Sequence, residues 1–201
     1  MASASKTKGS TFERDIAKEL NKLFDTNEFA RTFGSGAFVG KSNWNKRSGL
    51  STDLKNALAG DIIVPAWFPF NIECKNYQDS PVYHNILTTD GDKTLDGWLG
   101  KSIHDSINTK TLPIVIFKTT RKGVFVALHN TVSHYVNCEN YANYKTFMIM
   151  SLDNFKPIIQ DIIETMKQSP DSVPLFYEKF EKVCLDVNCS VNKLYVNFKD
   201  N

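Results

Sequence analysis

Two acidic residues and a lysine, close together in apolar surroundings, have the side-chain types best suited to chemistry. Glu73 and Lys75 end an apolar run that begins at Phe70 and are separated only by Cys74. Side chains alternate along a β-strand, so Glu73 and Lys75 should share one face and Cys74 the other. A charged pair in such a run is costly to bury unless it is paired or used, which makes this strand a candidate site.

A third charged residue, Asp61, begins the preceding apolar run, twelve residues before Glu73. The two runs are joined by a short proline-rich turn, 65–69, so we expect a hairpin that places both carboxylates at one sheet edge. Two like charges at short range repel and are best held by a divalent cation. Hard oxygen ligands suit Mg²⁺, with Mn²⁺ as a substitute, and Lys75 could polarise or deprotonate a water on the metal.

The elements that position these residues alternate between helical and strand-like patterns. Apolar spacing predicts a helix at 11–24, capped by Ser10 or Thr11 and carrying another acid, Glu13, with Arg14 beside it. We interpret residues 1–10 as a flexible basic N-terminus and 37–59 as a loop with at most a short helix. The tail from residue 176 has helical and then strand-like character. The other predicted elements are strands at 29–33, 61–64, 70–75, 112–118, 124–128 and 147–150, and helices at 95–107 and 154–167. This order predicts an α/β fold, a central mixed β-sheet flanked by helices.

Length and composition exclude several classes of protein. The 201 residues are 41% hydrophobic and 23% charged, typical of a globular chain and not of a disordered, collagen-like or disulfide-rich one. No apolar run approaches the roughly 20 residues that span a bilayer, so we expect no membrane segment. The N-terminus lacks the pattern of a signal peptide, which predicts a cytoplasmic, non-secreted protein with reduced cysteines. A zinc site from His134, Cys138, Cys184 and Cys189 is the less favoured alternative.

Charge is unevenly distributed along the chain, although the net charge is only +2. Residues 1–60 carry ten basic and six acidic residues, whereas residues 61–201 carry fourteen and sixteen. This asymmetry is compatible with a contact between the N-terminal part and a polyanion, and equally with a solvated basic face.

Five sequence pieces in order resemble one known family. They are Lys8-Gly9-x3-Glu13-Arg14, Arg31-Thr32-Phe33-Gly34-Ser35-Gly36, Gly60-Asp61-Ile62-Ile63, Ile72-Glu73-Cys74-Lys75 and the run 112–118. Together they resemble the PD-(D/E)XK nuclease superfamily, and within it the archaeal-type Holliday junction resolvases and their phage relatives. The resemblance covers roughly residues 6–130. Gly60 replaces the proline of the family motif, and His104 occupies the region where some phage relatives carry a glutamine.

The resemblance implies a fold, an activity and a set of site residues. The fold would be restriction-endonuclease-like, with a nuclease domain at 11–135 and a C-terminal extension at 136–201 packed on it. The activity would be Mg²⁺-dependent hydrolysis of DNA four-way junctions by a homodimer. Asp61, Glu73 and the Cys74 carbonyl would hold metal, Glu13 a second metal or its water, and Lys75 the attacking water. The resemblance and the basic surface together suggest DNA contacts at Lys8, Arg14, Arg31, Ser35, Lys41, Lys46 and Arg47.

Two other functions stay open at this point. One is a different PD-(D/E)XK nuclease, acting in repair, restriction or DNA processing, which the preferred DNA substrate would distinguish. The other is a catalytically inactive DNA-binding protein of the same fold, which a test of metal dependence would distinguish. Trp44 could stack on a base at a branch point or pack back on the protein as a loop residue.

Overall fold

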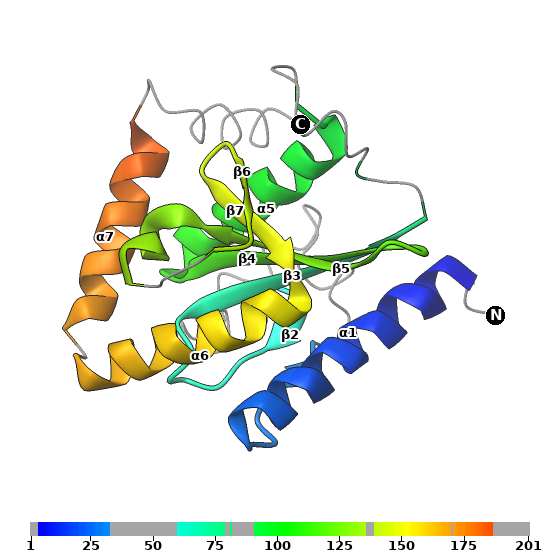
Figure 1. Ribbon diagram of the computed structural model, residues 1–201, viewed down its shortest axis with the longest axis horizontal. Coiled ribbons are helices and arrows are strands. Elements are labelled where there is room, and N and C mark those ends of the chain that lie inside the picture. Colours follow the sequence, from blue (N-terminus) through cyan, green and yellow to red (C-terminus); the bar gives the residue numbers. More distant parts are fainter. Residues whose placement is uncertain are drawn as a thin grey trace, which may run out of the picture.

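The structure is a computed structural model that describes residues 4–32, 60–78, 81, 91–135, 139–169 and 171–186 (Figure 1). The predicted loop at 37–59, the strand-like tail and four DNA-binding candidates, Ser35, Lys41, Lys46 and Arg47, lie outside these residues. The described elements are α1 (Ala4–Phe24), β1 (Ala30–Arg31), β2 (Ile62–Ile63), β3 (Phe70–Tyr77), α5 (Lys93–Thr109), β4 (Leu112–Thr119), β5 (Gly123–His129), the 3₁₀ helix η2 (Asn130–Tyr135), β6 (Ala142–Tyr144), β7 (Phe147–Ser151), α6 (Leu152–Gln168) and α7 (Ser172–Leu185).

Five of the strands form one mixed sheet in the order β3-β4-β5-β7-β6. The pair β3–β4 is parallel, with α5 as the crossover between its strands, and the other neighbours are antiparallel. β1 and β2 form a separate antiparallel pair. The predicted mixed sheet is therefore confirmed, with β3 as one of its edge strands.

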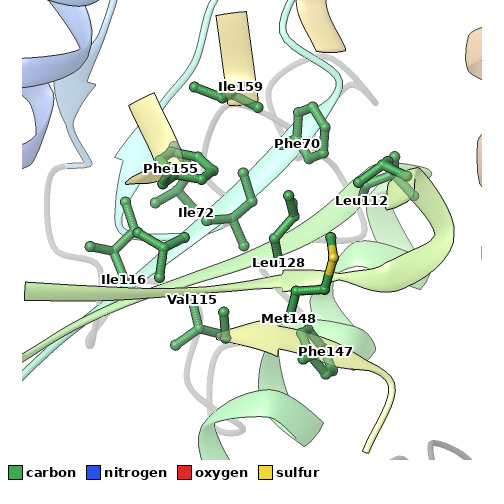
Figure 2. Close-up of a cluster of buried hydrophobic side chains, with 14 of the residues drawn as sticks. Phe70, Ile72, Leu112, Val115, Ile116, Leu128, Phe147, Met148, Phe155 and Ile159 are labelled. Atoms are coloured by element: carbon green, nitrogen blue, oxygen red, sulfur yellow. The ribbon is translucent and has the colours of Figure 1, made fainter. Parts of the chain in front are cut away.

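Helices cover both faces of this sheet, and alternation along the strands decides what each helix meets. Phe155 and Ile159 of α6 lie over Ile72 of β3 and Ile116 of β4 (Figure 2). α1 lies beside α6 on the same face, since its residues Ile16 and Leu20 border a small cavity with Ile116 and Phe155. On the opposite face, Trp98 of α5 contacts Tyr77 and Phe117 through ring centroids 4.9 and 5.9 Å apart. The architecture is the expected restriction-endonuclease-like α/β fold.

Elements after residue 140 continue this core. β7 pairs with β5 in the sheet, and α6 buries a set of residues that recur at helical spacing, Phe155, Ile158, Ile159, Ile162, Ile163 and Met166. Lys156 of α6 forms an ion pair with Glu19 of α1 at 2.8 Å, and the Gln160 side chain donates to the Leu23 carbonyl at 3.1 Å. α6 therefore holds the helix that carries Glu13.

Two expectations about local structure are wrong. α1 begins at Ala4, not near Thr11, because the Ser10 and Thr11 hydroxyls donate to the Thr7 carbonyl inside the helix instead of capping it. β2 and β3 do not form a hairpin ladder, and β2 pairs with β1. The connection from β2 to β3 contains Pro65 and Pro69, which have no N–H to donate to a ladder. None of the described helices has the length and apolar character needed to cross a lipid bilayer.

A buried histidine lies between the sheet and α7. His129 ends β5, and its ring lies edge-on to Phe147 and Phe180, with centroids 5.2 and 4.9 Å away. Its Nδ1 accepts from the Thr131 backbone N–H at 3.3 Å. Burial lowers the pKa of His129 to about 3, so the ring is neutral in the folded protein at neutral pH.

This burial predicts a loss of stability in mild acid. The unfolded chain binds a proton at His129 near pH 6.5, whereas the folded chain does so only near pH 3, so stability falls as the pH drops below about 6.5. Relative to His129→Leu, the wild type should lose about 2 kcal/mol of unfolding free energy between pH 7.5 and pH 5. Urea unfolding of both proteins at the two pH values measures this. A difference that stays constant with pH would contradict a buried neutral His129.

Candidate active site

β3 carries the two charged residues at the centre of the site. Glu73 is buried, and its Oε1 accepts a hydrogen bond from Lys75 Nζ, two residues along the same strand. The same face of β3 also points toward α5, whose Lys101 donates to Glu73 Oε2 at 2.6 Å. Each oxygen of this buried carboxylate therefore has its own ammonium partner.

Asp61 reaches β3 through two hydrogen bonds. Its backbone N–H donates to the Ile72 carbonyl at 2.8 Å, and its Oδ2 accepts from the Cys74 N–H at 2.8 Å. These bonds bring the Asp61 carboxylate beside Cys74, the neighbour of Glu73 in β3, without the hairpin that the sequence predicted. Burial and the charge of Glu73 raise the pKa of Asp61 to about 6, although the charge of Lys75 and the Cys74 N–H oppose the shift.

Cys74 offers a backbone group, and not its thiol, to this site. In an extended strand, the N–H and C=O of one residue point to the same edge, so the Cys74 carbonyl points toward the edge where its N–H meets Asp61. Burial raises the pKa of the Cys74 thiol, and the negative charges of Asp61, Glu73 and Glu13 raise it further. A thiol in these surroundings stays protonated and is a poor metal ligand.

Gly60 allows the close approach of Asp61 to β3. Its φ of +78° is in the left-handed region, and a Cβ at this position would lie 2.2 Å from Asn71 Oδ1 and 2.6 Å from the Ile72 carbonyl oxygen. Proline cannot adopt this φ, because its ring restricts φ to about −65°. The glycine that replaces the family's proline is therefore a requirement of this local backbone.

Lys101 is the site residue that sequence reasoning missed. His104 of α5, noted from the sequence, contacts Asp105 and Asn108, and the α5 residue that donates to Glu73 is Lys101. The available sequence signal for Lys101 was its i, i+4 spacing from Asp105, which predicts an ion pair on one helix face. The two side chains form this ion pair at 3.0 Å. Burial alone would lower the pKa of Lys101, but the charges of Glu73 and Asp105 outweigh it and raise the pKa.

Glu13 lies at the border of this site. Its carboxylate accepts from Arg31 Nε, so the helix α1 and the strand β1 are joined by an ion pair. Among the described residues, no group of three or more His, Cys, Asp or Glu side chains is arranged to hold a metal ion. The structure therefore brings together Asp61, Glu73 and Lys75, with Glu13 engaged by Arg31.

The carboxylate oxygens of Asp61 and Glu73 suit a hard divalent cation. Asp61 and Glu73 are both buried, and burial together with repulsion from the charge of Glu73 raises the pKa of Asp61. A cation that takes oxygen ligands would relieve this repulsion, and Mg²⁺ and Mn²⁺ are of this kind.

The DNA-binding candidates of the described residues differ in their surroundings. Lys8 and Arg14 are exposed on α1, whereas Arg31 is partly buried against Glu13. Lys8 also borders an open cavity of about 410 Å³ together with Asn76 of β3 and Lys118 of β4. For the alternative zinc site, Cys184 is a buried residue of α7, and Cys138, Cys189 and the His134 side chain lie outside the described residues.

Comparison with known proteins identifies one family. The model of a family described as "Phage putative PDDEXK endonuclease" matches residues 4–176, from the start of α1 into α7. No curated protein and no solved structure matches the chain.

The role of Gly60 predicts a position-specific loss of stability. Gly60→Ala places a Cβ against the Ile72 carbonyl at a strained φ, so the free energy of unfolding should fall by at least about 1 kcal/mol. Gly97→Ala is a matched control, because nothing lies within 4 Å of the Cβ it would add to α5. That control should be neutral or gain about 0.5–1 kcal/mol, the usual advantage of Ala over Gly in a helix. Equal effects in urea unfolding would contradict this account of Gly60.

Proposed function

The chain belongs to this phage family of PD-(D/E)XK endonucleases, and on that premise we propose that it is a Mg²⁺-dependent DNA endonuclease that resolves four-way junctions. The observation that carries the metal dependence is the placement of two buried carboxylates, Asp61 and Glu73, beside the backbone of Cys74. The preference for junctions rests on the order of sequence pieces that resembles archaeal-type Holliday junction resolvases.

Three groups would hold the cation. They are the carboxylates of Asp61 and Glu73 and the carbonyl of Cys74, and Glu13 could join them once its ion pair with Arg31 is exchanged. A divalent metal bound there supplies Lewis-acid activation of water and charge stabilisation at the phosphate. Mn²⁺ would be a substitute for Mg²⁺, because it also accepts hard oxygen ligands.

Lys75 is placed to act on the attacking water. Its Nζ forms an ion pair with Glu73 Oε1 on the same face of β3, and its side chain retains some exposure to solvent. An ammonium at this position can orient a water molecule, or accept its proton after losing its own, and general acid–base help of this kind is typically about 10²–10⁴-fold.

DNA would approach from the side of the basic N-terminal part. Lys8 and Arg14 are exposed on α1, and Arg31 lies close to Glu13, so these three could contact phosphates near the site. Ser35, Lys41, Lys46 and Arg47 remain candidates for the same role. A four-way junction has two-fold symmetry and two strands to cut, so the proposed substrate implies a C2 homodimer.

The direct test compares a synthetic four-way junction with a duplex of matched sequence. The wild type should cut two opposed strands of the junction in Mg²⁺, cut the duplex far less, and cut neither in chelator. Asp61→Asn and Glu73→Gln should abolish cleavage and retain junction binding, because DNA affinity comes mainly from Lys and Arg contacts to phosphate. Asp153→Asn, whose side chain is 90% exposed on α6, is the matched control and should cut normally.

Each arm of this test can fail separately. Near-normal cleavage by Asp61→Asn or Glu73→Gln would contradict the metal assignment. Equal cleavage of junction and duplex would contradict the substrate and leave the metal assignment intact. A monomeric mass by light scattering, with and without junction, would contradict the dimer.

The two neighbours Cys74 and Lys75 should respond differently to truncation. Cys74→Ala removes a buried thiol but keeps the backbone carbonyl, so cleavage should persist and stability should fall by at most about 1–2 kcal/mol. Lys75→Ala should fold and lose about 10²–10⁴-fold in cleavage rate. Single-turnover rates and thermal unfolding measure both effects. An inactive Cys74→Ala beside an active Lys75→Ala would overturn the assignment.

A further inference from the structure

Glu73 has one more cation than the sequence motif provides. Lys75, on the same strand, donates to Oε1, and Lys101 of α5 donates to Oε2 at 2.6 Å. A cation that uses Glu73 as a ligand must therefore meet a carboxylate whose two oxygens are already bonded. Each oxygen has a second lone pair for a metal, but the cation would stand beside two ammonium groups, and the repulsion between these positive charges favours the departure of one of them.

The surroundings of the two lysines indicate which one moves. Lys101 has a second anion, since its Nζ also donates to Asp105 Oδ2 at 3.0 Å, one helical turn further along α5. Its side chain is 37% exposed, against 19% for Lys75, so it has more freedom to leave Glu73. Asp105 is itself buried, and His104 Nδ1 lies 3.3 Å from its Oδ1, so this second anion is held in place.

We propose that Lys101 is a positioning residue that holds Glu73 Oε2 in the metal-free protein and is displaced onto Asp105 when a divalent cation binds. The buried charge of Glu73 is then compensated in both states, by Lys101 before binding and by the cation afterwards. This inference rests on the proposed metal-dependent function and deepens it, because it makes metal affinity a competition with a residue of the protein itself.

The competition predicts opposite effects for two variants. Lys101→Met removes the competing ammonium, so Mn²⁺ should bind about tenfold tighter than to the wild type. Asp105→Asn removes the anion that receives Lys101 after displacement, so Mn²⁺ should bind several-fold more weakly. A merely structural role for the pair would weaken metal binding in both variants, because both would loosen α5 against β3.

Isothermal titration with Mn²⁺, without DNA, measures these affinities independently of cleavage. Lys93→Met is the matched control, because Lys93 is an exposed lysine on the same helix, and its affinity should equal that of the wild type. Lys101→Gln removes the charge but can still donate to Glu73 and Asp105, so it should also bind Mn²⁺ more tightly and keeps the test informative if Lys101→Met folds poorly; Lys101→Arg retains the cation and should bind like the wild type.

The outcomes separate this inference from the proposed function. A wild type that binds no Mn²⁺ contradicts both the metal-dependent function and the competition. Wild-type binding with unchanged or weaker affinity in Lys101→Met overturns the competition alone. Wild-type binding with a tighter Lys101→Met and a weaker Asp105→Asn supports it.

Discussion

The burial of the Glu73 carboxylate is the constraint on which the rest of the site depends. A charge with this little access to water is stable only if nearby groups replace the hydration it has lost. Lys75 supplies one partner from the same strand, and Lys101 supplies another from α5. The packing of α5 on the sheet therefore has an electrostatic component in addition to the apolar contacts of Trp98.

The second carboxylate is placed by the way β2 meets the edge of β3. The Asp61 N–H donates to the Ile72 carbonyl, and the Asp61 carboxylate accepts from the Cys74 N–H. One residue therefore satisfies two backbone groups at the edge of β3. This arrangement requires Gly60, because any Cβ there would collide with the Ile72 carbonyl. A regular hairpin would have bonded this edge to β2 along its length and left less backbone for a ligand.

Much of the fold could be predicted from the sequence because its periodicities are strong. The six buried residues of α6 recur at helical spacing, and the paired strands β4 and β5 are apolar runs around Gly123. The start of α1 could not be predicted in this way, since Ser10 is a good helix cap in many proteins and here bonds inside a longer helix. The expected hairpin ladder is absent because the connection to β3 carries Pro65 and Pro69, which offer no N–H to it, and β2 pairs with β1 instead, a partner that local spacing does not reveal.

In the site, too, some contacts could be predicted from local sequence, and others depend on tertiary packing. Strand alternation is local, so it was enough to place Glu73 and Lys75 on one face. The contact of Lys101 with Glu73 depends on how α5 is rotated over the sheet, which is decided by its buried apolar residues, among them Trp98, whose ring contacts Tyr77 of β3 and Phe117 of β4. Helical spacing shows only that Lys101 and Asp105 share a face. The packing of that face against a buried carboxylate turns an ordinary i, i+4 ion pair into part of the site.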